Sequence, residues 1–191
     1  MKKLDAVVFT HEHKDHIAGL DDIRPFNYQQ QKPMNIFATP QVQEALKREY
    51  RYVFDDNFAY PGIPEVDLHT IGSGPFKMGD IGFIPIQVFH YKLPVLGFRI
   101  GDFTYITDAN AIPPAEMEKV RGSRVVVLNA LRKDPHISHF TLDEAIEVMN
   151  ELKPEQGYFT HISHLLGTHE SINKELPENL ALAHDRLVIE V

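Results

Sequence analysis

The stretch Thr10-His11-Glu12-His13-Lys14-Asp15-His16 follows an apolar run and places three imidazoles and a carboxylate within six positions. Alternate residues of an extended segment point to the same side, so His11 and His13 can hold one cation together. Asp15 and His16 come where the chain must turn, and they can face a second cation beside the first. Imidazole nitrogen combined with carboxylate oxygen suits zinc, manganese or iron rather than calcium or magnesium. The stretch therefore predicts a metal-binding loop that a buried strand delivers to one edge of a sheet.

The alternative interpretation of this stretch is a polar loop with chance histidines. Histidine makes up only a few per cent of ordinary sequence, so three of them within six positions, with an acid beside them, are not typical of such a loop. The spacing also has a metal-binding mechanism, which favours the metal interpretation.

The pattern H-x-H-x-D-H after a hydrophobic strand resembles that of the metallo-β-lactamase superfamily. Two further stretches, Ile17–Arg24 and Tyr158–His164, resemble the branch that contains the phosphoribosyl cyclic phosphodiesterases of phosphonate breakdown, and the likeness runs over nearly the whole chain. The mixture of predicted strands and helices by itself indicates only an α/β or α+β protein. The resemblance implies the particular fold, a four-layer αββα sandwich in a single metallo-hydrolase domain over residues 1–191.

Hydrophobic patterning and turn residues predict the individual elements. The most clearly predicted helix covers residues 141–152, where a capping threonine and Glu144 complete a capping box. Further helices are predicted over residues 41–52 and 17–24, the latter ended by Pro25, with a short one over residues 113–120. Strands are predicted over residues 4–10, 34–39, 66–71, 81–89, 95–100, 103–107, 124–128, 157–160 and, as a pair, within 180–191, and residues 53–64 are predicted as a loop.

The resemblance also implies a set of metal ligands. Two divalent metal ions, Zn or Mn with Fe as a further option, would be held by His11, His13 and His90 for one ion, by Asp15, His16 and His161 for the other, and by Asp108 as a bridge. His90, Asp108 and His161 each follow a predicted strand, where sheet-based folds commonly place ligands. A lone histidine or aspartate at such a place is more often structural, so the assignment of His90 and Asp108 depends on the first motif.

Three residues are predicted to act on the substrate or on the nucleophile. In the resembled phosphodiesterases, a histidine shortly before the last long helix reaches the substrate phosphate or the leaving group. His139 fits that place best, and His136 is its competitor. His164 fits a second phosphate contact, while Asp15 would orient the nucleophile as well as bind metal. The alternative for these histidines is a capping or surface role.

The resulting hypothesis is metal-assisted hydrolysis of a small cyclic or ribose-linked phosphodiester. Two cations would lower the pKa of a bound water and hold it as a bridging hydroxide. Protonated His139 would stabilise the phosphate or donate a proton to the leaving alcohol.

Composition limits the partners of the chain. The 191 residues suit one domain with a proper core. The formal net charge of −8 argues against a nucleic-acid partner, which needs a basic face, so we expect a small phosphorylated substrate. No cysteine is present, which excludes disulfides and thiolate ligands. Nothing approaches the ~18 apolar residues of a spanning helix, so we expect no membrane partner and a cytoplasmic location.

One departure from the resembled family affects these expectations. Its members carry several strands ahead of the metal motif, which begins here at residue 11. We therefore expect an N-terminally truncated sandwich whose uncovered edge is compensated by a homo-oligomer or leaves a less stable chain.

Two alternatives to the phosphodiesterase stay open. One is another hydrolase of the superfamily, either a nuclease that processes tRNA 3′ ends or a thioesterase, and the other is a metal-binding remnant without activity.

Overall fold

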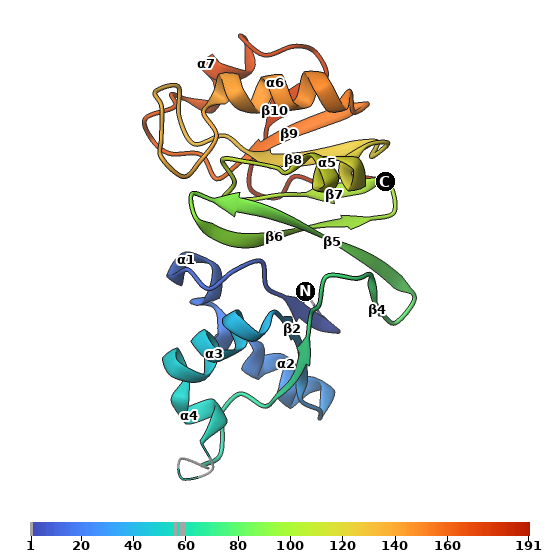
Figure 1. Cartoon of the computed structure of the whole chain (residues 1–191). Helices are drawn as coiled ribbons and strands as arrows, with labels where there is room; N and C mark the ends of the chain where they lie inside the picture. Colours follow the sequence, from blue (N-terminus) through green and yellow to red (C-terminus); the bar gives the residue numbers. More distant parts are fainter. Residues whose placement is uncertain (1, 56, 58–59) are drawn as a thin grey trace. The chain divides into compact units, whose positions relative to one another are not determined.

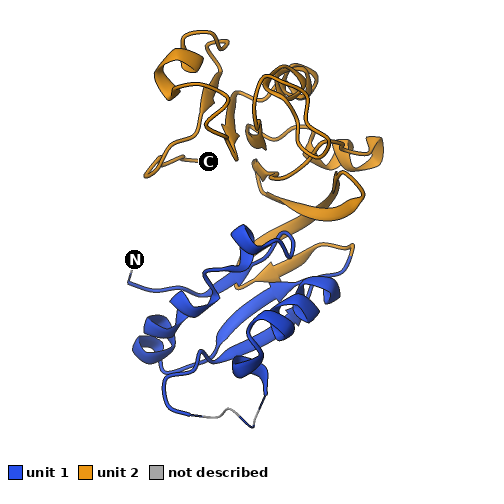
Figure 2. Cartoon of the chain, turned by 90° about the vertical axis from the view of Figure 1, so that its left-hand side faces the viewer, with its two compact units in different colours: residues 1–72 blue, residues 73–191 orange. Residues whose placement is uncertain are grey.

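The computed structural model describes residues 2–55, 57 and 60–191. The chain divides into two compact units, with the boundary between Gly72 and Ser73 (Figure 2). Each unit has its own β-sheet and its own cluster of buried apolar side chains. The first unit carries the predicted metal-binding loop, and the second carries the other predicted site residues.

The first unit is built on a parallel three-stranded sheet in the order β1-β2-β3 (Figure 1). Its elements are β1 (Ala6–Val8), α1 (Lys14–Ile17), η1 (Leu20–Ile23), α2 (Arg24–Gln30), β2 (Met34–Ala38), α3 (Pro40–Glu49), α4 (Arg51–Phe54) and β3 (Val66–Thr70). In β2 the alternate residues Met34, Ile36 and Ala38 are buried, and they share a core with Ile17 of α1 and Leu46 of α3. Because successive strand residues point to opposite faces, this alternation fixes which face of the sheet the helices cover.

The second unit is built on a seven-stranded sheet in the order β10-β9-β8-β7-β6-β5-β4. Its elements are β4 (Phe76–Met78), β5 (Ile81–His90), β6 (Leu93–Ile100), β7 (Phe103–Tyr105), α5 (Pro114–Val120), β8 (Val125–Asn129), α6 (Leu142–Leu152), β9 (Gln156–Thr160), α7 (His169–Asn173) and β10 (Leu180–Leu182). Strands β7 to β10 are parallel, and β4 to β7 are antiparallel. Because β7, β8 and β9 run in one direction, the loops that follow them lie at the same edge of the sheet.

Helix α6 begins as the sequence predicted, and it lies over the second unit's sheet (Figure 1). The Thr141 hydroxyl accepts a hydrogen bond from Glu144 N, and the Glu144 carboxylate accepts one from Thr141 N. The helix packs closely on β9, since a Cβ at Gly157 would stand 2.5 Å from Leu180 Cδ2 and 3.1 Å from Met149 Sδ. Glycine at this position is therefore what allows the helix and the neighbouring strand to approach.

The mixed α/β class is confirmed, but three predicted boundaries were wrong. Pro25 does not end a helix; it lies in the first turn of α2, where its missing N–H costs no helical hydrogen bond. The helix predicted over residues 41–52 is divided at Tyr50, whose φ of −117° and ψ of 43° are not helical. In the tail, β10 is the strand found in place of the predicted pair. Phe58 of the predicted loop lies outside the described residues.

Within the described part of the chain, no helix combines the length and the apolar character that crossing a bilayer requires.

Candidate metal centre

The loop after β1 gathers the four predicted donors of the first unit. Helix α1 begins directly after His13, whose carbonyl accepts from His16 N at 2.9 Å, so the chain turns where the sequence predicted. The His11 ring centroid lies 4.8 Å from that of His13 and 4.2 Å from that of His16. Asp15 Oδ2 lies 3.3 Å from His16 Nε2. Three imidazoles and one carboxylate therefore converge within this unit.

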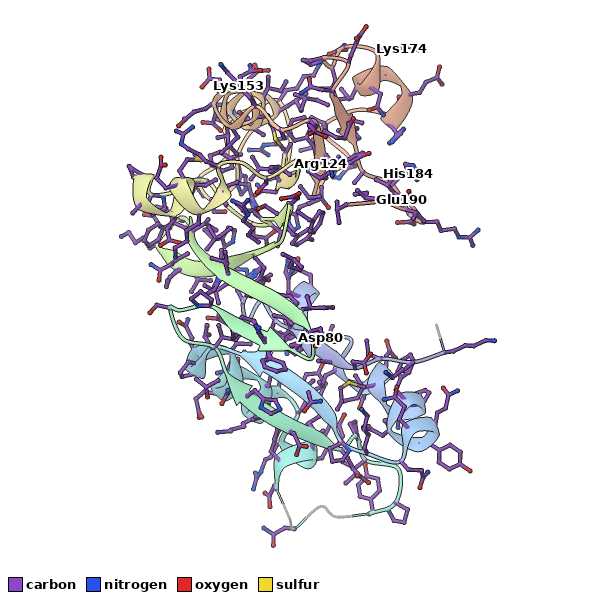
Figure 3. All side chains as sticks on the ribbon, turned by 90° about the vertical axis from the view of Figure 1, so that its right-hand side faces the viewer. Asp80, Arg124, Lys153, Lys174, His184 and Glu190 are labelled. Atoms are coloured by element: carbon purple, nitrogen blue, oxygen red, sulfur yellow. The ribbon has the colours of Figure 1, made fainter. Side chains whose placement is uncertain are left out.

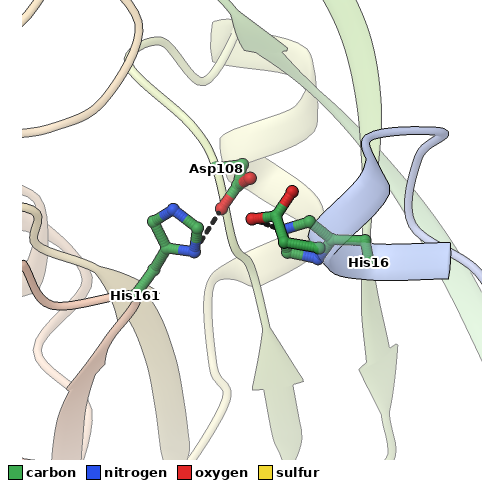
Figure 4. A group of neighbouring side chains, drawn as sticks. His16, Asp108 and His161 are labelled. Atoms are coloured by element: carbon green, nitrogen blue, oxygen red, sulfur yellow. Dashed lines mark ion pairs between the residues drawn. The ribbon is translucent and has the colours of Figure 1, made fainter. Parts of the chain in front are cut away.

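The second unit gathers donors from the ends of its strands. His90 is the last residue of β5, Asp108 follows β7, and His161 follows β9 directly. Asp108 Oδ1 and His161 Nδ1 are 2.9 Å apart, as the dashed line in Figure 4 shows. Asp108 is almost fully buried, and a buried carboxylate is retained in proteins when it is paired or when it binds metal.

His139 lies at the centre of a row of four histidines in this unit. Its ring centroid is 4.5 Å from that of His90, 5.0 Å from that of His136 and 4.9 Å from that of His161. The buried Nδ1 atom of His139 has no hydrogen-bond partner among the described residues. A buried polar atom of this kind calls for a ligand, an ion or a water. The row thus contains an unsatisfied nitrogen beside the predicted ligands.

The surroundings of His139 in the described structure favour its neutral form, and its protonation in the metal-loaded site stays a prediction. Burial lowers its pKa to about 4, with Asp108 opposing the shift and the charges of neighbouring histidines adding to it. The ring is therefore neutral at pH 7, because desolvation penalises the charged imidazolium. Burial also lowers the pKa of His136, and the geometry brings both histidines into the row without choosing between them.

His164 is not brought to this row. It is exposed, and in the described part of the unit no ring contact, hydrogen bond or ion pair joins it to the four histidines. Its predicted phosphate contact stays a prediction.

Hydrogen bonds from the surrounding loops orient the predicted ligands. The His90 Nδ1 atom lies 2.8 Å from the Ser138 carbonyl oxygen. A carbonyl only accepts, so Nδ1 carries the proton and the neutral ring presents its lone pair at Nε2, as metal-binding histidines commonly do. The Thr107 hydroxyl donates to Asp108 Oδ1 at 2.8 Å. The protein therefore fixes the tautomer of one predicted ligand and supports the carboxylate of another.

The backbone is strained at these same strand ends. Asp108 has a φ of +54° and His161 a φ of +53°, in the left-handed region that residues with a Cβ seldom occupy. Such conformations persist only where the surrounding structure holds them, and they cluster at functional sites. Next to Asp108, the buried Asn129 side chain accepts from Ala109 N at 2.7 Å and donates to Ala109 O at 2.9 Å.

Several of these supporting residues were missed at the sequence level. Asn129 could have been noticed, because it is the polar end of an otherwise apolar buried strand. Asn110 gave no such signal. Its amide accepts from Tyr91 N at 2.8 Å and donates to Ile137 O at 3.0 Å, so it joins two loops that are distant in sequence.

The donor chemistry of both units fits a divalent metal of the zinc, manganese or iron kind. Every predicted ligand is an imidazole or a carboxylate, and the chain has no thiolate to offer. This combination suits borderline transition metals. The orphaned Nδ1 of His139 and the fixed tautomer of His90 fit a centre that would hold such a group.

Two sheets in an α/β chain, with histidine and aspartate donors after the strands, are typical of one class of metallo-hydrolases. The chain matches the model of the beta-lactamase superfamily domain over residues 1–162 and belongs to that family. The resemblance inferred from the motif is therefore confirmed.

Solved structures support the same class. A diphosphatase from the PhnP family is 37% identical with a TM-score of 0.91, and the match covers 100% of this chain and 73% of that one. The metallo-beta-lactamase fold protein YhfI from Bacillus subtilis is 18% identical with a TM-score of 0.73, over 94% of this chain and 74% of that one, which shows the fold alone. The fold and the diphosphatase neighbour support a metal-dependent hydrolase.

Curated relatives carry other names. An octanoyltransferase of Porphyromonas gingivalis (strain ATCC BAA-308 / W83) is 32% identical over 186 residues, which are 96% of this chain and 37% of that protein. A ribonuclease Z of Mycobacterium sp. (strain KMS) is 26% identical over 149 residues, which are 69% of this chain and 52% of that protein. The chain therefore spans only a part of the curated relatives that it matches.

Proposed function

We propose that this chain is a metal-dependent phosphodiesterase that cleaves a small cyclic or ribose-linked phosphodiester. The observation that carries the proposal is the second unit's cluster, in which the Asp108–His161 pair lies beside the orphaned nitrogen of His139. The diphosphatase neighbour, at 37% identity, supports chemistry at phosphorus. The ligands proposed are the seven residues expected from the sequence: His11, His13, Asp15, His16, His90, Asp108 and His161.

The chain's own residues have distinct roles in this proposal. When bound, two divalent cations would supply an activated water and neutralise charge on the phosphoryl oxygens. His90 presents Nε2 because Ser138 engages its other nitrogen. His139 would offer an N–H to a phosphoryl oxygen or to the leaving group, and the protonated form expected from the sequence stays a prediction. Zinc or manganese as the metal, a homo-oligomer and a cytoplasmic location are parts of the proposal.

A nuclease is the second candidate, favoured by the ribonuclease Z relatives. The charge of the chain weighs against it. The formal net charge is −8, and basic residues of the second unit are paired with acids, as Arg124 is with Glu155 and Lys174 with Glu170. Figure 3 shows Arg124, Lys153 and Lys174 at separate places rather than in one patch. A backbone-binding surface needs clustered, available cations.

The test is metal content by mass spectrometry together with hydrolysis of bis(p-nitrophenyl) phosphate in added Mn or Zn. We expect about two metal ions per chain and turnover that a chelator abolishes. His13→Ala should lose metal and activity while remaining folded. His69→Ala is the matched control, because His69 is exposed and its ring stacks on Phe37 outside both clusters.

Three outcomes would count against the proposal. Full activity of metal-free His13→Ala would overturn it. Metal binding without turnover would favour the inactive remnant, and cleavage of a tRNA precursor in preference to small diesters would favour the nuclease.

A further inference from the structure

The hairpin between β5 and β6 places a tyrosine where glycine is usual. His90 pairs with Leu93, so Tyr91 and Lys92 form a two-residue loop. Tyr91 has a φ of +58°, and tight hairpins that need positive φ at the first loop position usually place glycine there. The tyrosine is nevertheless half exposed, so it is not part of the buried core. Strain of this kind at an exposed side chain suggests a functional reason for the residue.

A second exposed apolar residue, Ile137, is joined to the same hairpin through the side chain of Asn110. Ile137 is 65% exposed. One Asn110 side chain holds both loops, since it accepts from Tyr91 N at 2.8 Å and donates to Ile137 O at 3.0 Å. The two side chains are therefore presented from a rigid frame within the second unit.

These two residues are close in sequence to residues of the proposed centre. Tyr91 directly follows His90, and Ile137 comes two residues before His139, whose ring lies 4.5 Å from that of His90. The Lys92 ammonium lies 5.2 Å from the centroid of the Tyr91 ring, which adds a cation beside the aromatic surface. An aromatic face with a cation beside it, together with an exposed aliphatic side chain on the loop that Asn110 joins to the same hairpin, suits a planar group attached to a phosphate.

We propose that Tyr91 and Ile137 form a subsite that stacks on a planar aromatic group of the substrate, such as the base of a nucleotide. This inference rests on the proposed function and narrows it to phosphodiesters that carry such a group. Tyr91 and Ile137 then determine specificity, and Asn110 is a positioning residue for both.

The test compares adenosine 5′-monophosphate with ribose 5-phosphate, which differ only by the base. Binding of each to the full, metal-loaded chain is measured by calorimetry. Loss of the stacking contact with one base typically weakens binding about tenfold. Tyr91→Gly should therefore bind adenosine 5′-monophosphate about tenfold more weakly and bind ribose 5-phosphate as the parent does. Glycine relieves the strain at this φ, so the variant should fold at least as well as the parent.

Further variants make the result specific. Tyr91→Phe should bind like the parent, and Ile137→Ala should weaken only the nucleotide. Tyr60→Gly, at an exposed tyrosine of the first unit, should change neither ligand. Equal affinity of the parent for both ligands, or an equal loss of both in Tyr91→Gly, would overturn the subsite while leaving the proposed function intact. Absence of phosphate-ester binding and hydrolysis in the metal-loaded parent would contradict the proposed function and the subsite with it.

Discussion

Single residues in this chain are held by neighbours that the motif does not include. Asp108 has a positive φ, and the Asn129 side chain hydrogen-bonds both the N–H and the carbonyl of the next residue, Ala109. These two hydrogen bonds to one residue restrain the backbone beside the carboxylate. The residue that orients a predicted ligand is therefore as important to the geometry as the ligand itself.

Asn129→Ala should destabilise the chain by roughly 1–3 kcal/mol, because it leaves the buried N–H of Ala109 unsatisfied, while Ala109 O keeps its hydrogen bond from Phe140 N. The loss should appear as a lower midpoint in urea unfolding, and metal affinity should fall with it. Asn173→Ala is the matched control, since Asn173 makes a similar bridge between Leu182 N and His169 O away from the predicted ligands. Equal losses in both variants would contradict a special role for Asn129.

Tyr52 provides a test by pH at the residue scale. Burial raises its pKa to about 12, and the hydrogen bond to Asp21 adds to the shift. A phenol whose folded pKa exceeds its unfolded value of 10 stabilises the fold fully below pH 10 and loses that contribution as pH rises toward 12. The free energy of unfolding should therefore fall less steeply between pH 10 and 12 in Tyr52→Phe than in the parent. Identical slopes would refute this assignment.

Secondary-structure elements show where sequence patterns succeed and where they fail. Helix α6 was predicted because its capping box is local, with Thr141 and Glu144 three positions apart. The loop of His11 to His16 was predicted for the same reason. Asn110 was missed because its two partners, Tyr91 and Ile137, come near it only through the fold. Pro25 was misread because proline suits the first turn of a helix as well as its end.

The contact between α6 and β9 can be tested by adding one methyl group. Gly157→Ala would place its Cβ against Leu180 and Met149, so we expect a loss of about 1–3 kcal/mol from overpacking. Gly82→Ala in β5 is the control, because nothing lies within 4 Å of a Cβ there. Leu180→Val in the Gly157→Ala background should restore part of the loss. Equal stability of the two single variants, measured by thermal unfolding, would show that the sheet yields at Gly157.

At the scale of the whole molecule, the proposed ligands are divided between two units that each have their own core. The family match extends over residues 1–162 and so includes all seven of them. The resemblance to the metallo-β-lactamase superfamily implied this set, and the ligands lie in the loop after β1, in the short helix α1, or at or beyond the ends of strands. Sequence reasoning could not reach the hydrogen bonds that orient them, which depend on residues from separate loops.

Removal of the metal should lower the thermal stability of the chain. A ligand that binds only the folded chain stabilises it by mass action, by about 2.7 kcal/mol at a concentration one hundred times its Kd. Zinc or manganese should therefore raise the melting temperature of the chelated parent and leave that of His13→Ala much less changed. An equal rise in both proteins would mean that the metal acts elsewhere.

The donor set described above has a consequence for the kinds of stress the centre tolerates. Its predicted ligands are imidazoles and carboxylates, and the chain contains no cysteine. Peroxide and alkylating agents that strip zinc from thiolate sites attack sulfur, so such reagents should leave this centre loaded. Mild acid should empty it, because protons compete directly with metal for imidazole nitrogen. The proposed enzyme would then lose its metal in mild acid and keep it in the presence of such oxidants.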